Sequence, residues 1–349
     1  MRKIYLFTII VLFWQQGFSQ SSDQNYIRTR TFIKTGNEYM DQIQYYDGLG
    51  RLSQTVQVGA SPLNGADLVS IVQYDGIGRE HKNWLPVPLS TNAGQFVDTA
   101  TFKSNAVSVY ADAKPYSETR YEPSPLNRIT DQFGAGSSWH NNNKRVTTSY
   151  GTNDGSVARF FVNESGFLQR GSNYAAGTLY KTIVTDEDGK SVTEFKDKLG
   201  RVVMSRKSGD VDTYYVYNDL DQLFMVLPPL ASDGLKVHTA GVPIPMTNDF
   251  LKKYAYIYTY DRRGNQTTKK LPGCDTVVSM IYDKANRLIM SQDRNQKSKQ
   301  QWLVNKYDIL GRLLYTSILN REITSSEKNY IYDNVIIESY IGGADKGFA

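Results

Sequence analysis

The chain has 349 residues, of which 40% are hydrophobic and 21% are charged. This balance excludes a disordered chain, and 27 glycines and 11 prolines are too few for a collagen-like one. The net charge of +5 comes from basic residues scattered singly between aromatic residues, so we expect no nucleic-acid partner. The 25 tyrosines, with many valines and threonines, favour strands and predict an all-β fold.

Residues 1–19 are predicted to be a signal peptide. Arg2 and Lys3 precede an apolar run over residues 4–14, and Gly17 and Ser19 are small residues of the kind that a signal peptidase reads. The run is shorter than the roughly 20 residues that span a bilayer. No cysteine follows it, so lipid attachment is not expected. We therefore expect a secreted or cell-surface protein cut after Ser19, with an uncleaved anchor as the alternative and no membrane span after cleavage.

The short motif Tyr-Asp-x-x-Gly-Arg recurs along the chain. Some copies are variants, with Lys196 in the tyrosine position, Asn218 in the aspartate position, or Asn286 in the glycine position. A truncated copy stands at Tyr332 and Asp333. The residues assigned to the repeated motif are Tyr46, Asp47, Gly50, Arg51, Tyr74, Asp75, Gly78, Arg79, Asp197, Gly200, Arg201, Tyr217, Tyr260, Asp261, Gly264, Tyr282, Asp283, Arg287, Tyr307, Asp308, Gly311 and Arg312.

Each copy is predicted to be the loop of a β-hairpin. Asp47 can accept a hydrogen bond from the backbone two residues on, and Gly50 can supply the left-handed conformation of a type I turn with a bulge. Asn286 can adopt the same conformation. In this loop Asp47 lies opposite Arg51 and Tyr46 lies opposite Leu52, so the motif specifies the register of its own hairpin.

The spacing of the copies predicts a tandem array. The last four motif tyrosines are 22, 25 and 25 residues apart, which accommodates two strands and two turns. Residues 227–245 interrupt the array with a proline-rich segment, which is predicted to be a loop where strand pairing lapses. Residues 181–195 read as two strands around a turn at 186–189, and the tyrosines at 254, 256, 258 and 260 alternate along one strand face.

Residues 90–178 differ from the rest of the chain. They are polar and carry several prolines, so short strands between long loops are expected there. No long amphipathic helix is predicted after the leader, although a short one could begin near residue 248. We place the domains at residues 20–150, a smaller β-rich N-terminal domain, and residues 151–349, the repeat array.

Residues able to carry chemistry are few. His81, His140 and His238 lie far apart, and no base is evident for the lone thiol of Cys274. Asp186 and Asp188 precede a glycine that comes too early for a calcium loop. Because turn geometry explains the motif aspartates, we expect no catalytic residue, no metal, no cofactor and no enzyme activity; an unrecognised hydrolase is the weaker alternative.

The motif copies resemble the YD repeats of Rhs-type proteins. The resemblance covers most of residues 179–340 and recurs at 46–86. Residues 116–129 are similar to the linking segment ahead of such repeats in large exported bacterial Rhs proteins. The N-terminal part of the chain therefore resembles the uncharacterised domain that opens those proteins. The resemblance implies a spiral of hairpins forming a hollow shell around a C-terminal effector, often a toxin. The self-cleaving core and the effector of that family have no counterpart in this sequence.

These observations predict an extended, curled sheet of hairpins that forms part of an Rhs-like shell. The sheet is expected to run from about Tyr180 to Tyr340 and to leave an open edge, so that the chain alone associates or aggregates. The implied partners are downstream repeats with their core and an effector, on the same or a separate chain. The alternative function is an extracellular adhesin or carbohydrate-binding module that binds cell-surface glycans.

Overall fold

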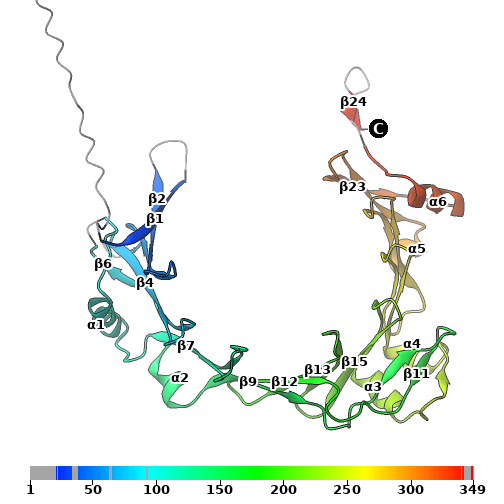
Figure 1. The fold of residues 1–349 in the computed structure, drawn as a ribbon. Helices are drawn as coiled ribbons and strands as arrows, with labels where there is room; N and C mark the ends of the chain where they lie inside the picture. Colours follow the sequence, from blue (N-terminus) through cyan, green and yellow to red (C-terminus); the bar gives the residue numbers. More distant parts are fainter. Residues whose placement is uncertain are drawn as a thin grey trace, which may run out of the picture. The chain divides into compact units, whose positions relative to one another are not determined.

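The computed structural model describes residues 21, 23–33, 38–62, 65–91, 93–338, 340–341 and 347–348 (Figure 1). The leader and its cleavage site lie outside the described residues. The described part is mostly β and is built from antiparallel hairpins, which confirms the predicted fold class. No helix in these ranges is long and apolar enough to cross a membrane. The chain divides into two compact units, Met1–Thr148 with Asp186–Asp188, and Ser149–Thr185 with Gly189–Ala349.

The first unit is a run of antiparallel strands that pair in chain order. β4 is flanked by β3 and β5 and also pairs with the short β6. The strands are β1 (Asn25–Phe32), β2 (Tyr39–Tyr46), β3 (Leu52–Gln57), β4 (Asp67–Tyr74), β5 (Glu80–Trp84), β6 (Val87–Leu89), β7 (Tyr116–Tyr121), β8 (Ile129–Phe133) and the first half of β9 (Arg145–Thr152).

A helix covers part of the core of this unit. Alternate residues of β2, β3 and β4, among them Ile43, Val56 and Val69, are buried on one face. Helix α1 (Thr99–Tyr110) packs Phe102 and Ala106 into the same cluster. The expectation of strands and loops alone over residues 90–178 was therefore wrong. Only these two helix residues are buried, so the apolar period is weak in the sequence. The short helix α2 (Ser137–Asn141) follows β8.

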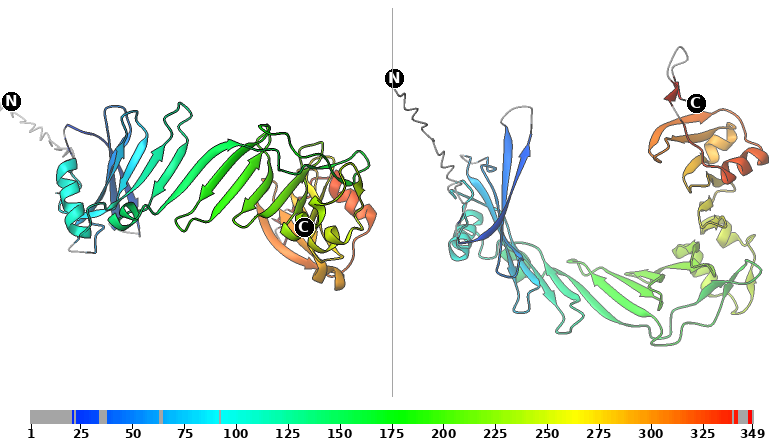
Figure 2. Two further views of the ribbon diagram at one scale, coloured as in Figure 1. Left: turned by 90° about the horizontal axis from the view of Figure 1, so that it is seen from below. Right: turned by 45° about the horizontal axis from the view of Figure 1, so that its top comes forward.

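The second unit contains the longer run of hairpins, whose strands lie side by side in the views of Figure 2. Each strand from β12 to β16 and from β18 to β23 pairs antiparallel with the next, and β16 pairs with β18. The strands are β12 (Tyr180–Thr185), β13 (Ser191–Lys196), β14 (Val202–Lys207), β15 (Val211–Tyr217), β16 (Leu223–Leu227), β18 (Tyr256–Tyr260), β19 (Gln266–Lys270), β20 (Val277–Tyr282), β21 (Leu288–Gln292), β22 (Trp302–Tyr307) and β23 (Leu313–Leu319). The predicted hairpin around residues 186–189 is confirmed as β12–β13.

The proline-rich segment is an insertion and not a lapse in the sheet. Because β16 pairs directly with β18, the sheet continues past it. The inserted residues form helix α3 (Pro229–Lys236), strand β17 (Pro243–Ile244) and helix α4 (Asp249–Tyr254), the short helix expected near residue 248. β17 joins β10 (Phe160–Val162) and β11 (Leu168–Arg170) in a small separate sheet. Tyr254 ends α4, so it does not belong to the predicted row of strand tyrosines.

The array ends earlier than predicted. β23 ends at Leu319, and Tyr332 and Asp333 lie at the end of helix α6 (Ser325–Asp333) instead of in a hairpin. A capping box between Thr324 and Glu327 starts this helix, and no glycine follows to close a hairpin loop. A short helix, α5 (Arg294–Ser298), links β21 and β22. Strands β24 (Tyr340–Ile341) and β25 (Gly347–Phe348) pair with each other.

Candidate functional site: the hairpin loops and the cavity beside α6

The motif loops have the predicted geometry. The backbone N–H groups of Leu49 and Arg51 both donate to Asp47 Oδ1 at 2.9 Å. Asp47 Oδ2 accepts a bond from Arg51 Nε at 2.8 Å. Gly50, with a φ of 75°, donates to the carbonyl of Asp47. Tyr46 lies opposite Leu52, as predicted. One carboxylate therefore holds the whole loop by hydrogen bonds to groups within four residues.

The same bonds recur in the other loops. The aspartate accepts from the arginine Nε at 2.6–2.8 Å in the copies at Asp75, Asp197, Asp283 and Asp308. Asn265 replaces the arginine beside Asp261, and Gln222 replaces it beside Asn218. The left-handed position is occupied by Asp221 and Asn286 in two loops and by glycine in the others, Gly78, Gly200, Gly264 and Gly311.

The motif tyrosine of one hairpin contacts the hairpin before it, a contact that the repeated motif did not predict. The guanidinium of Arg51 lies over the ring of Tyr74, 4.4 Å from its centroid. The Tyr74 hydroxyl donates to the carbonyl of Leu52, the residue after that arginine, at 2.9 Å. We call this pair of contacts the inter-hairpin latch: an arginine stacked on the next tyrosine, whose hydroxyl binds the backbone beside the arginine.

The inter-hairpin latch recurs in both units. Tyr217 stacks under Arg201 at 5.0 Å and donates to the Val202 carbonyl at 3.1 Å. Tyr307 does the same with Arg287 at 5.2 Å and the Leu288 carbonyl at 3.1 Å. Each latch fixes one hairpin against the next at their loop ends, so the motif sets the seam between repeats as well as the loop.

Some motif tyrosines lack part or all of the latch, and two of these follow a loop in which another residue replaces the motif arginine. Tyr260 follows a loop with Gln222 there and makes only the hydroxyl bond, to Leu223 at 2.8 Å. Tyr282 follows a loop with Asn265 there, and its hydroxyl reaches Met280 Sδ at 3.8 Å. The first motif tyrosine, Tyr46, reaches Gln44 Oε1 at 3.5 Å.

Tyr121 is a latch residue outside the predicted motif copies. Arg79 lies over its ring at 4.4 Å, and its hydroxyl donates to the Glu80 carbonyl at 2.8 Å. It precedes a hairpin loop closed by an ion pair between Glu122 and Arg128. That loop is two residues longer than the motif, which hid it inside the segment read as a linker. The detectable signal was a strand-ending tyrosine followed by an acidic residue and a closing Asn-Arg.

The pKa is lowered for five motif aspartates, Asp47, Asp75, Asp261, Asp283 and Asp308. Hydrogen bonds from the backbone and side chain of Arg79 lower the pKa of Asp75 to about 2, although its desolvation opposes this. The backbone bond from Arg312 likewise lowers the pKa of Asp308. For Asp283, burial raises the pKa, but bonds from Arg287 and the backbone outweigh it and the pKa is lowered. A general acid needs a raised pKa, so these groups suit a structural role.

The C-terminal strap, residues 332–338, crosses the loop ends of three successive hairpins. Tyr332 stacks under Arg263 at 3.8 Å, where a truncated motif copy had been predicted. The Ile336 carbonyl accepts from Arg287 at 2.6 Å, and its N–H donates to Asp283 at 3.2 Å. Glu338 N–H donates to the Tyr307 carbonyl at 2.8 Å. The strap leaves the Asp283 side chain fully buried.

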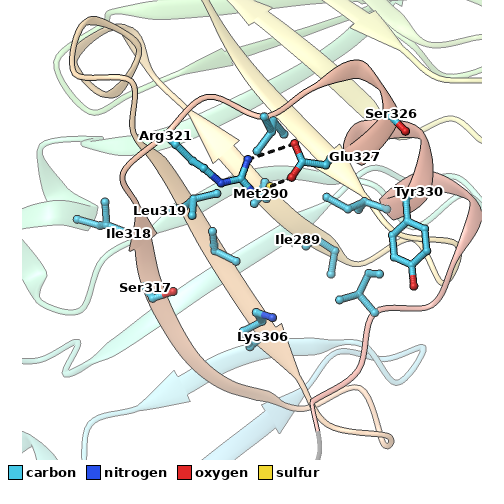
Figure 3. A pocket seen from close by; sticks show the side chains of 14 residues that line it. Ile289, Met290, Lys306, Ser317, Ile318, Leu319, Arg321, Ser326, Glu327 and Tyr330 are labelled. Carbon is cyan, nitrogen blue, oxygen red and sulfur yellow. Dashed lines mark hydrogen bonds and ion pairs between the residues drawn. The ribbon is translucent and has the colours of Figure 1, made fainter. Parts of the chain in front are cut away.

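A cavity of about 620 Å³ lies between α6 and strands β21, β22 and β23 (Figure 3). Ile289, Val304 and Ile331 supply apolar walls, and Ile318 and Leu319 line it from β23. The ion pair of Arg321 and Glu327, 2.6 Å apart, also lines it. Such a cavity suits apolar side chains rather than a charged substrate.

His81 and His140 are held by structural contacts, whereas His238 Nδ1 is buried without a hydrogen-bond partner among the described residues. His81 Nδ1 lies 3.0 Å from the Thr119 carbonyl, and His140 is stacked on Phe133. Cys274 is a free, half-buried thiol. Within the described ranges no group of three or more His, Cys, Asp or Glu side chains could hold a metal ion.

Comparison with known proteins gives one family match. Residues 20–152 match a family model described as a domain of unknown function (DUF6443). This agrees with the expectation of an uncharacterised N-terminal domain. No curated protein matches the chain.

Solved structures give distant matches. One is the crystal structure of TcdB2–TccC3–Cdc42, with a TM-score of 0.49, and another is the Photorhabdus luminescens Tc holotoxin pore, with a TM-score of 0.48. Both are 13% identical, and each match covers 90% of this chain. The chain spans only 15% of the length of these proteins. Similarity at this level says nothing about activity.

Proposed function

We propose that this chain is a non-enzymatic structural segment of an exported Rhs-like protein, in which its sheet of hairpins forms part of a wall around an effector. The inter-hairpin latch carries this proposal. It occurs between successive hairpins in both units, and it uses the motif residues to hold neighbouring hairpins together. A protein whose most repeated polar residues serve such seams is suited to building a continuous surface.

The polar groups of the motif support a structural role. The carboxylate of Asp308 accepts two backbone N–H groups and the guanidinium of Arg312. The copies at Asp47, Asp75, Asp197 and Asp283 do the same, which leaves little capacity for binding a substrate. The wall and the enclosed effector are inferred from the resemblance to YD repeats. The proposed partners are further repeats with their core and an effector, in the same chain or a separate one. Export by the leader is part of this proposal.

Protease protection tests the function. The chain is expressed from its natural locus together with whatever sequence follows residue 349, purified, and treated with protease. The following segment should resist cleavage while this chain is intact. Replacing Tyr217, a latch residue, by alanine should expose it, whereas Tyr46→Ala, at a tyrosine without a latch, should expose it less. Equal cleavage of the segment with and without this chain would contradict enclosure.

A carbohydrate-binding module is the second candidate. A polar cavity of about 250 Å³ is lined by Tyr215 and Tyr217 together with Asp219, Asp221 and Arg159. Aromatic faces beside carboxylates are a combination that binds sugars. A glycan array with the purified chain separates the two candidates. Saturable binding that Asp219→Ala abolishes favours the module, and no binding favours the wall segment.

A further inference from the structure

Strand β23 is an edge strand with an apolar surface. Among the described strands it pairs only with β22. Leu313, Leu314 and Ile318 on this strand are all exposed. Unpaired edges with exposed apolar side chains readily accept a further strand.

The loop before β23 carries half of an inter-hairpin latch. Arg312 pairs with Asp308 at 2.6 Å, like the other motif arginines. However, no aromatic ring of the described residues lies against it, and 73% of its side chain is exposed, compared with 13% for Arg287. No tyrosine hydroxyl of the described residues donates to the carbonyl of Leu313, the position that accepts one at Leu52, Val202 and Leu288.

We propose that the β23 edge binds an antiparallel β-strand that ends in Tyr-Asp, supplied by a further hairpin of the same kind. The incoming tyrosine stacks under Arg312 and donates its hydroxyl to the Leu313 carbonyl. This inference rests on the proposed function and names the partner that the wall segment takes. The repeated geometry of the seams already formed selects this occupant over other apolar partners.

The cavity beside α6 adds a second feature to the same surface. Ser317 lies opposite Val304 and Leu319 lies opposite Trp302, so both share the face of the sheet that packs on α6. Side chains of an added strand on that face come next to Ser317 and Leu319, which line the cavity. An apolar side chain of the incoming strand can therefore enter it.

A peptide tests this surface. The probe is a fluorescent peptide that copies residues 301–314 of this chain, which contain β22 and its Tyr-Asp, and the readout is its anisotropy with the full chain. Saturable binding is expected. Arg312→Ala in the protein should weaken it roughly two- to fivefold by removing the cation–π contact. Arg294→Ala, which removes an exposed arginine from α5, is the matched control and should leave it unchanged.

Two further probes keep the result independent of how Arg312→Ala folds. A peptide with Tyr307→Leu, measured against the unaltered protein, should bind more weakly than the parent. Peptides N-methylated at alternate residues test strand addition, because only every second N–H faces the partner strand. One methylated set should lose binding and the other should keep it. Binding that survives both sets and the Tyr307→Leu change, or no binding at all, overturns the proposal.

A second copy of the chain is the competing occupant. Sedimentation that shows a dimer dissociated by Arg312→Ala, but not by the peptide, would assign the edge to self-association and overturn the proposal. The peptide result is separable from the proposed function. An edge that fails to bind the peptide leaves the protease-protection experiment untouched, and loss of protection leaves the peptide affinity untouched.

Discussion

The hydroxyl of Tyr74 donates a hydrogen bond to the backbone carbonyl of Leu52, 2.9 Å away, in the preceding hairpin. Arg51, next to Leu52, lies over the ring of the same tyrosine. A copy with a latch therefore does two things: its aspartate closes its own loop, and its tyrosine holds the copy before it. The order of residues in the motif matches these two tasks, because the tyrosine ends the strand that faces the preceding hairpin.

Removing one latch hydroxyl should destabilise the first unit. Tyr74→Phe deletes the bond to Leu52 and should lower the free energy of unfolding by about 0.5–1.5 kcal/mol. Tyr46→Phe deletes only a 3.5 Å contact with Gln44 and should cost less. Urea unfolding of both variants measures the difference. Equal midpoints would mean that the latch hydroxyl contributes nothing.

Replacing the loop glycine of the last hairpin should cost stability through the backbone alone. Gly311 has a φ of 78°, and no atom lies within 4 Å of the position that a Cβ would take. Gly311→Val should therefore cost about 1–3 kcal/mol from its conformation and not from a clash. Leu310→Ala, at a residue that is 73% exposed, should change little. The turn assignment fails if both variants unfold at the same urea concentration.

The loop aspartates Asp283 and Asp308 should contribute unequally to the free energy of unfolding, because they differ in burial. The Asp283 side chain is fully buried under the C-terminal strap and holds Arg287, which is only 13% exposed. Asp283→Ala leaves that cation without its partner and should cost about 3–5 kcal/mol. Asp308 makes the same bonds within its own loop, but its partner Arg312 is mostly exposed. Asp308→Ala should cost much less, because an exposed ion pair contributes little, and denaturant midpoints of the pair test the contrast.

Stability should fall in acid through the motif carboxylates. Asp75 has a pKa of about 2 in the folded chain, compared with about 3.9 when unfolded. A depressed pKa stabilises the fold above the unfolded value, and this contribution is lost as the pH falls from about 4 towards 2. Asp75→Asn should flatten this part of the pH profile, since Asn218 shows that an asparagine can hold the same loop. An unchanged profile of urea midpoint against pH would exclude Asp75 as a contributor.

Export predicts a defined N-terminus. The exported chain should begin at Gln20, because the small residues Gly17 and Ser19 follow the apolar run of the leader. Mass spectrometry of the extracellular or periplasmic protein measures this directly. Recovery of an exported chain that still begins at Met1 contradicts cleavage.

The local geometry of the hairpins could be predicted from the sequence, but their seams could not. Asp47 bonds to groups two and four residues away, and such short-range bonds depend on the order of residues alone. The contact of Tyr74 with Leu52 spans 22 residues and depends on which strands become neighbours. Tyr121 was missed for a related reason: a longer loop conceals the motif, while the latch it makes is unchanged.

The sequence by itself determined the repeated loop, the register of each hairpin and the mostly β fold, because turn bonds and strand propensities act within a few residues. The tertiary structure decided where the array is interrupted and where it ends. Residues 229–236 form α3 because Ala231 and Leu235 are buried in a core that includes Phe160 and Leu168, far away in the chain. Tyr332-Asp333 repeats the start of the motif, yet it lies in a helix held by its cap and by Arg263. A two-residue motif is compatible with either a hairpin loop or a helix, and burial against distant residues selects between them.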